Sequence, residues 1–278
     1  MYMEKPKIFV GKKNGPVSIV VGGIHGNETC GINAILKILP NFVIDRGTVI
    51  FVFGNPKAIA LNKRFVTYNL NRLFGQESSY DEKIKKSYEY KRAQYLKTIF
   101  DQADAMLDIH STTNKSKPFI ICEKNADKIV KYFPKNFVRK VSGFGGVEPG
   151  ATDDYMSSRG KIGITIECGQ HNDGNAEKIA IKSIKAFLEI LGHIKKTKRP
   201  PIKRTAVHMM RLYHTKTNSF KLAKVMDDFY EAKKDELIGV DGKEEIRTDE
   251  KCLVVFAHNI NKKDEEAFLI GKKIGKTK

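Results

Sequence analysis

Two polar segments of the sequence contain side chains that could bind a metal ion. The segment GGIHGNE at residues 22–28 holds His25 and Glu28, three residues apart in a glycine-rich stretch. Imidazole nitrogen and carboxylate oxygen both bind zinc, at roughly 2.0–2.2 Å. Glycine lets the backbone bend sharply, so both side chains could point to one place. A His and a Glu at this spacing are frequent by chance, so the pair is a weak signal by itself.

A third metal ligand is expected in the segment DIHST at residues 108–112. In a strand, Asp108 and His110 would point to the same side. A carboxylate beside a ligating histidine can accept its second ring N–H and orient the ring, here that of His110 or of His25. Two histidines and one carboxylate leave a fourth position for water, which is typical of a catalytic zinc site.

Each of these residues also has a structural explanation. A histidine at the end of a strand is often a loop residue held by hydrogen bonds. Glu28 could stand near the start of the following helix, where the helix dipole favours a carboxylate. The metal hypothesis is favoured because His25, Glu28 and His110 follow separate predicted strands, the first two in a glycine-rich context. Residue types alone still leave both explanations open.

The pattern of apolar residues predicts an α/β fold with a mainly parallel or mixed central sheet flanked by helices. In such sheets, sites lie beyond the carboxyl ends of the strands, where the two polar segments fall. Short apolar runs predict strands at Val17–Gly22, Val49–Phe53, Ala103–Ile109, Pro118–Cys122 and Gly163–Glu167. Helical spacing predicts helices at Gly31–Leu39, Asp81–Phe100 and Ala176–Leu191.

The segment Lys195–Arg204 is basic, contains two adjacent prolines and is typical of a linker. Beyond it, short strand-like runs occur at Val207–Arg211, Leu253–Phe256 and Ala267–Ile270. We therefore expect a catalytic domain at residues 1–195 and a small β-rich C-terminal domain at residues 196–278.

Composition indicates a globular protein with a basic surface. The 278 residues are 41% apolar and 29% charged, and the formal net charge is +18. A strong positive charge is compatible with a nucleic-acid or other polyanion partner. However, the basic residues are dispersed, and neither zinc-finger spacing nor an aromatic RNA-binding motif occurs, so nucleic acid is not expected. A lysine-rich proteome would equally explain the charge.

Other features of the sequence favour a cytoplasmic location. No apolar run is long enough to span a membrane, and the N-terminus has no secretory pattern. The four cysteines are scattered, which favours free thiols in a reducing compartment. The sequence is compatible with a homo-oligomer.

Four segments in order resemble the succinylglutamate desuccinylase and aspartoacylase family, relatives of the zinc carboxypeptidases. They are GGIHGNETCG at 22–31, NPKAIALNKRFVTYNLNRLF at 55–74, DIHST at 108–112 and TIECGQH at 165–171. The combination is specific and spans most of the expected catalytic domain. The resemblance implies a zinc carboxypeptidase-like fold.

The resemblance also implies roles for individual residues. His25, Glu28 and His110 would bind one Zn²⁺ per chain. Glu167 would be the general base and Arg64 would lie near the scissile carbonyl. Asn71 and Arg72 would contact the carboxylate end of the substrate. Family members also use a tyrosine and an arginine shortly before the base; Tyr155 and Arg159 are the nearest candidates, although their spacing departs from the family pattern.

The expected activity is that of a zinc-dependent amidohydrolase that removes an acyl group from a small anionic N-acyl amino acid. A zinc-bound water would attack the amide while Glu167 acts as general base. The nearest alternative is a zinc carboxypeptidase acting on small peptides, and a C-terminal domain covering the site would argue against it. A polyanion-binding protein is a more remote alternative. The acyl group and the amino acid cannot be read from the sequence.

Overall fold

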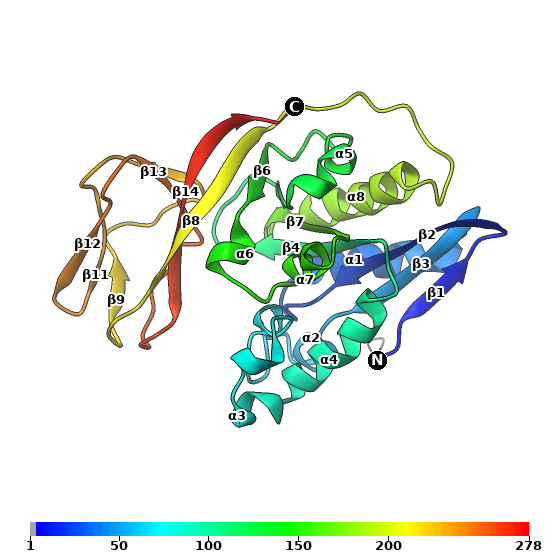
Figure 1. Ribbon diagram of the computed structural model, residues 1–278. Helices are drawn as coiled ribbons and strands as arrows, with labels where there is room; N and C mark the ends of the chain where they lie inside the picture. The colour runs from blue at the N-terminus through cyan, green and yellow to red at the C-terminus, as the bar shows by residue number, and fades with distance from the viewer. Residues whose placement is uncertain (1–3, 278) are drawn as a thin grey trace.

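Buried apolar strands alternate with helices along the first two thirds of the chain and assemble into one large sheet, as the computed structural model of residues 4–277 shows (Figure 1). The strands are β1 (Lys7–Val10), β2 (Lys13–Gly22), β3 (Arg46–Phe53), β4 (Ala105–Thr112), β5 (Phe119–Ile121), β6 (Arg139–Ser142), β7 (Ile162–Gln170), β8 (Thr205–His214), β9 (Phe220–Leu222), β10 (Tyr230–Ala232), β11 (Leu237–Asp241), β12 (Glu244–Arg247), β13 (Cys252–Val255) and β14 (Glu266–Lys276). The α-helices are α1 (Thr29–Ile38), α2 (Pro56–Ala60), α3 (Glu82–Lys85), α4 (Tyr88–Phe100), α5 (Asp127–Val130), α6 (Phe144–Val147), α7 (Thr152–Ser158) and α8 (Ala176–Ile190). Short 3-10 turns lie at Leu39–Asn41, Leu70–Arg72, Glu77–Ser79 and Lys124–Ala126.

The central sheet is mixed and confirms the expected α/β class. Its eleven strands run in the order β1-β3-β2-β4-β7-β5-β6-β8-β14-β13-β10. The neighbours β3, β2, β4 and β7 are parallel, whereas β5 runs antiparallel to β7. The carboxyl ends of β2, β4 and β7 therefore meet at one edge, where the polar segments of the sequence follow them.

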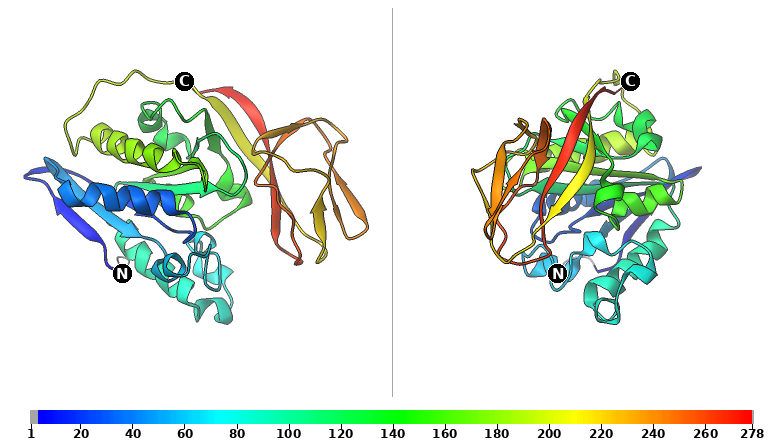
Figure 2. Two further views of the ribbon diagram at one scale, coloured as in Figure 1. Left: turned by 180° about the vertical axis from the view of Figure 1, so that it is seen from behind. Right: turned by 60° about the vertical axis from the view of Figure 1, so that its left-hand side comes forward.

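Helices cover both faces of the sheet, and the alternation of side chains along β2 shows how. Val20 packs in the cluster that includes residues of α1 and α8, whereas Ile19 and Val21 pack in the cluster that includes residues of α4 and α7. Figure 2 shows α1 and α8 side by side on one face. Successive strand residues point to opposite faces, so a strand buried on both sides needs a continuous apolar run.

The predicted strands of the first 195 residues are confirmed with shifts of a few residues at their ends. The helices predicted at Gly31–Leu39 and Ala176–Leu191 are confirmed in the same way, as α1 and α8. The single long helix expected at Asp81–Phe100 is wrong. The structure has two helices, α3 and α4, because Ser87 ends the first and caps the second: its hydroxyl accepts a hydrogen bond from the Tyr90 N–H at 3.2 Å.

The C-terminal strands are joined to the central sheet by direct strand pairing. β8 lies parallel to β6 on one side and antiparallel to β14 on the other, and β14 continues to β13 and β10 (Figure 1). A second sheet, β12-β11-β9, completes this region. The C-terminal region is thus β-rich as expected, and the sheet continues across the expected boundary between domains.

The expected linker has no helix or strand through residue 204, and it ends at a buried arginine. The guanidinium of Arg204 donates hydrogen bonds to the backbone carbonyls of five residues: Val130, Phe133, Pro134, Phe137 and Ile202. This arginine ties the end of the linker to the segment around α5. Within residues 4–277, no helix has the length and apolar content to cross a membrane.

Candidate active site

The loop that follows β2 folds back tightly, and its glycines make this possible. Gly23 has a φ of +71°, a conformation that favours glycine. At Gly26, an added Cβ would lie 2.2 Å from the backbone carbon of Ala58, so no side chain fits there. The loop therefore presses against α2 and turns both His25 and Glu28 towards the end of β4.

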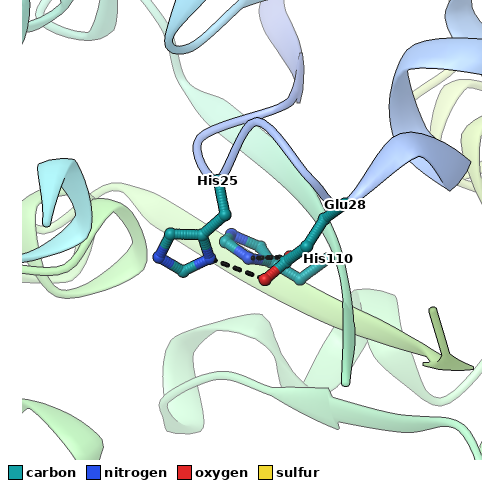
Figure 3. A group of neighbouring side chains, drawn as sticks. All are labelled: His25, Glu28 and His110. Atoms are coloured by element: carbon teal, nitrogen blue, oxygen red, sulfur yellow. Dashed lines mark hydrogen bonds and ion pairs between the residues drawn. The ribbon is translucent and has the colours of Figure 1, made fainter. Parts of the chain in front are cut away.

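His25, Glu28 and His110 converge on one point although they come from two separate elements (Figure 3). The Nδ1 atoms of His25 and His110 each lie 2.8 Å from a different oxygen of the Glu28 carboxylate. All three side chains are buried. Glu28 immediately precedes α1, but it makes no capping hydrogen bond, so its carboxylate is used by the two histidines instead.

Neighbouring polar groups orient the two imidazole rings. His25 Nε2 lies 3.0 Å from Asn69 Oδ1, and His110 Nε2 lies 3.0 Å from Asp108 Oδ2. The second contact is close but not aligned as a hydrogen bond. Asp108 also accepts a 2.6 Å hydrogen bond from the Thr152 hydroxyl. The sequence left open whether Asp108 would orient His110 or His25. In the structure Asp108 lies beside His110, and Asn69 lies beside His25.

Glu167 lies next to this cluster on the adjacent strand. His110 of β4 and Glu167 of β7 are paired in register, so they share one face of the sheet. The Glu167 side chain lines the same cavity as the three clustered residues, and the residue is 7% exposed. Its Oε2 is buried without a hydrogen-bond partner among the described residues. Burial, reinforced by the negative charge of Glu28, raises the pKa of Glu167 well above its usual range.

The electrostatics of His25 and Glu28 suit metal ligands, whereas His110 favours a proton. Burial lowers the pKa of His110, but the charges of Asp108 and Glu28 outweigh it and raise this pKa well above its usual range, so a metal ion would replace a proton there. Burial and the nearby Arg64 lower the pKa of His25 to about 4, so this ring is neutral at pH 7. Burial opposes ionisation of Glu28, but the two histidines outweigh it and hold its pKa well below the usual range. A neutral imidazole and an ionised carboxylate are the forms that bind a divalent cation.

The donor set fits zinc. One ligand atom from each of His25, Glu28 and His110 lies within 4.8 Å of the others. Two imidazole nitrogens and one carboxylate oxygen are the donors of many catalytic zinc sites, which keep one position open. Glu167 lies beside these three residues, and its Oε2 has no hydrogen-bond partner among the described residues, so it could interact with a molecule bound at the open position.

The cluster opens into a cavity of about 810 Å³. Its walls come from residues 64–84, from the ends of β4 and β7, and from the C-terminal region at residues 212–214 and 256–269. Arg64 lines it as expected, and its Nη1 donates to Glu28 Oε1 at 3.1 Å. The Arg64 side chain is 43% exposed, so it can approach a molecule in the cavity.

Asn71 and Arg72 also line the cavity, but both are engaged by the protein itself. Asn71 Oδ1 accepts a hydrogen bond from the Thr152 N–H at 3.1 Å. Arg72 donates from Nε and Nη2 to the two oxygens of Glu266, at 2.7 and 2.8 Å, and its Nη2 lies 2.7 Å from Glu148 Oε2. The Nε and Nη2 edge of Arg72 is thus paired with Glu266 in this structure, and its expected contact with a substrate carboxylate stays a prediction.

Tyr155 and Arg159 do not line the cavity, so the structure does not bring these two together with the other expected substrate-binding residues. The Tyr155 hydroxyl donates to Asp101 Oδ1 at 2.8 Å, and its ring packs with Phe74 and Phe100. The Arg159 guanidinium lies 3.6 Å from the centroid of that ring and also pairs with Asp101. Tyr155 on α7 belongs to the apolar cluster that includes residues of α4, and Arg159, which follows α7, packs on its ring.

Several residues of the site carried no signal in the sequence. Asn69 lies in a stretch where only its neighbours Asn71 and Arg72 were expected to act. Glu148 and Glu266 line the cavity from distant parts of the chain, and no spacing relates them to Arg72. His214 and His258 also line the cavity, and both are exposed. His171 lies beside the site and forms hydrogen bonds with the hydroxyls of Ser111 and Thr113.

Comparisons with known proteins agree with this geometry. Residues 14–194 match the family model described as succinylglutamate desuccinylase/aspartoacylase catalytic domain. The chain is 35% identical to an aspartoacylase of Xenopus tropicalis over 123 residues, which cover 39% of this chain and 38% of that protein. It is 30% identical to an N-acyl-aromatic-L-amino acid amidohydrolase (carboxylate-forming) of Rattus norvegicus over 197 residues, covering 62% of this chain and 60% of that protein. The alignments thus span less than two thirds of these relatives.

Solved structures show the same fold over nearly the whole chain. A succinylglutamate desuccinylase of Vibrio parahaemolyticus matches with a TM-score of 0.75 and 16% identity, covering 96% of this chain and 91% of that one. The ectoine utilization protein EutE (DoeB) of Ruegeria pomeroyi matches with a TM-score of 0.72 and 21% identity, covering 96% and 88%. With the family model matching most of its length, the chain belongs to the succinylglutamate desuccinylase/aspartoacylase family.

Proposed function

We propose that the protein is a zinc-dependent amidohydrolase that removes the acyl group from an N-acyl amino acid. The observation that supports this most is the convergence of His25, Glu28 and His110 beside Glu167 at the end of three parallel strands. The family contains aspartoacylases, succinylglutamate desuccinylases and an N-acyl-aromatic amino acid amidohydrolase, all of them named for removing acyl groups from amino acids. The four cysteines are buried and unpaired, which supports a reducing compartment such as the cytoplasm.

Zinc held by His25, Glu28 and His110 would act as a Lewis acid and lower the pKa of a water molecule to about 7. Glu167 would then take the proton of the attacking water and pass it to the departing amine. A buried carboxyl with a raised pKa suits both steps, because it can hold the proton between them. Arg64 would stabilise the negative charge that develops on the carbonyl oxygen.

The shape of the cavity favours a small substrate over a peptide. Side chains of the C-terminal region, among them Phe256, Ile260 and Phe268, form part of the wall of the cavity that also holds the residues of the catalytic cluster. This wall restricts the room for an extended chain on that side. It therefore supports an acylated amino acid as the substrate, in preference to the C-terminus of a longer peptide.

Replacing Glu167 with Gln tests the assignment of the base. The amide keeps the shape of the side chain but cannot take a proton, so we expect kcat to fall by about 10²–10⁴. Zinc content, measured by metal analysis of the purified protein, should stay at about one per chain as in the wild type. The control is Glu177→Gln, which changes a carboxylate on α8 that pairs with Lys37 outside the cavity. Near-normal turnover by the Glu167 variant would contradict the mechanism.

A panel of N-acyl amino acids tests the activity itself. Zinc-loaded protein should hydrolyse at least one member, and the same protein treated with a chelator should not. Release of the free amino acid is the readout. If protein that binds zinc hydrolyses no member of a panel of acetyl, succinyl and aromatic acyl derivatives, the proposed activity is wrong.

A further inference from the structure

The guanidinium of Arg72 is already paired with carboxylates of the protein. Glu266, at the start of β14, accepts hydrogen bonds from both Nε and Nη2, one to each carboxylate oxygen, in a bidentate pair. Glu148, in the loop before α7, lies 2.7 Å from Nη2. The remaining terminal nitrogen, Nη1, donates to the backbone carbonyl of Asn71 at 2.9 Å. The arrangement joins three segments that are far apart in the sequence.

This arrangement removes the binding mode by which arginine holds a substrate carboxylate. A carboxylate binds arginine best through two parallel hydrogen bonds to the Nε and Nη2 edge, and Glu266 occupies that edge. The Arg72 side chain is only 21% exposed, so it has little room to turn another edge to the cavity. Two carboxylates on one guanidinium also leave one excess negative charge at this end of the cavity.

The rest of the cavity is also lined by carboxyl groups, in contrast to the net charge of +18 of the whole chain. Seven of its lining side chains are aspartate or glutamate, against three from lysine or arginine. Glu28 serves the two histidines, and burial raises the pKa of Glu167 and of Asp153, so the acidic end of the cavity is the one formed by Glu148 and Glu266. Of these three cations, Arg72 is paired as described, and Lys262 pairs with the neighbouring Glu265. Arg64 contributes one donor to Glu28, and its other donors are left for the acyl carbonyl of the substrate.

We propose that the substrate presents a cationic group, an ammonium or a guanidinium, to Glu148 and Glu266. The protein would then act on N-acyl derivatives of basic amino acids, with the acyl carbonyl near Arg64 and the positive end of the side chain near the two glutamates. Each carboxylate oxygen has two lone-pair sites, so both glutamates can accept from a substrate cation while they remain bound to Arg72. This inference rests on the proposed function, since it assigns the substrate class of the same site.

Three ligands that differ mainly in the charge at the end of the side chain test the proposal. They are N-acetyl-L-glutamate, N-acetyl-L-glutamine and Nα-acetyl-L-ornithine. Calorimetric titration of the zinc-loaded Glu167→Gln variant gives Kd without turnover, and the wild type gives kcat/KM for the same compounds. We expect the ornithine derivative to bind about tenfold or more tightly than the glutamate derivative, with the glutamine derivative between them.

The variant Glu266→Gln should reduce this preference about tenfold, because it removes a negative charge while keeping the shape of the side chain. The matched control is Glu231→Gln on β10, which changes an exposed carboxylate outside the cavity that pairs with Lys273. The readouts are the ratio of kcat/KM for the ornithine and glutamate derivatives in one preparation and the Kd of each derivative, measured in the Glu167→Gln background. The Kd values show whether the ratio changes through weaker binding of the ornithine derivative or through tighter binding of the glutamate derivative. This ratio does not depend on the fraction of protein that is folded, so loss of stability in the variant does not affect it.

The possible outcomes separate this inference from the proposed function. Tighter binding and faster hydrolysis of the glutamate derivative by the wild type would overturn the inference and leave the amidohydrolase intact. Tighter binding of the glutamate derivative by Glu266→Gln than by the protein with Glu266 would show that an acidic substrate normally displaces Glu266 from Arg72. This result would also overturn the inference. Preference for the ornithine derivative in binding, without hydrolysis of any of the three, would support the inference and count against the activity.

Discussion

Asp153 is a carboxyl group of the cavity wall whose charge is poorly compensated. It lies on α7, is 8% exposed, and is near the negatively charged Asp108. Burial, and then the charge of Asp108, raise its pKa to about 7. An ordinary aspartate titrates near 3.8, so the folded chain retains this proton at pH values where the unfolded chain has lost it.

The stability of the protein should therefore depend on pH through Asp153. Because the folded-state pKa lies above the unfolded one, the stability from this group is complete below about pH 3.8 and is lost as the pH rises to about 7. Compared with Asp153→Asn, the wild type should lose about 1.4 kcal/mol of unfolding free energy for each pH unit between these values. Denaturant unfolding of both proteins from pH 4 to pH 8 measures this. A difference that does not change with pH would show that the carboxyl ionises normally.

At the scale of elements, the cavity depends on a buried carboxylate that lies outside it. Glu89, in the first turn of α4, is completely buried. Its oxygens accept hydrogen bonds from the backbone N–H groups of Val66, Thr67 and Tyr68, at 2.7, 3.2 and 3.4 Å. Thr67 and Tyr68 line the cavity, so α4 holds the loop that forms one of its walls.

Replacing Glu89 with Gln should loosen that loop. The amide keeps one acceptor and turns an NH₂ group towards the backbone donors, which should lower the unfolding free energy by about 1–3 kcal/mol. We also expect KM to rise by about tenfold while zinc content stays unchanged, because the loop orders the cavity wall but not the metal cluster. The matched control is Glu82→Gln on α3, an exposed carboxylate paired with Lys85. An unchanged thermal midpoint and KM in the Glu89 variant would refute this role.

At the scale of the whole molecule, the N- and C-terminal parts share a sheet and a core. β6 pairs with β8 in parallel, over the registers Arg139 to Thr205 and Ser142 to His208. One apolar cluster contains Phe119 and Val141 from the N-terminal part together with Val207, Met209 and Leu269 from the C-terminal part. Separating the parts would expose this cluster and the unpaired edge of β6 to water.

A chain that ends at residue 195 should therefore not be stable alone. We expect it to be insoluble or to unfold at much lower denaturant concentration than the full chain, because it loses the cover of its apolar cluster. The full chain should unfold in one transition, with coincident curves from far-ultraviolet circular dichroism and tyrosine fluorescence. A soluble truncated chain with native stability would show that residues 1–195 are an independent domain.

Much of the fold can be predicted from the sequence because its main signals are local. Val49–Phe53 is apolar throughout and Val17–Gly22 is so except for Ser18, as expected of strands buried on both faces. The long helix expected at Asp81–Phe100 failed because Ser87 can act as an N-cap, and apolar spacing alone did not show the interruption there.

The sequence by itself determined that His25, Glu28 and His110 come together, because they follow strands whose carboxyl ends must meet in a parallel sheet. Only the tertiary structure decided what surrounds that cluster. It brought Glu148 and Glu266 into contact with Arg72, and it placed the Tyr155 hydroxyl on Asp101, outside the cavity. The residue types alone did not indicate these contacts. Contacts between segments distant in sequence depend on how strands pair and on how loops fold over their ends, and no local pattern records them.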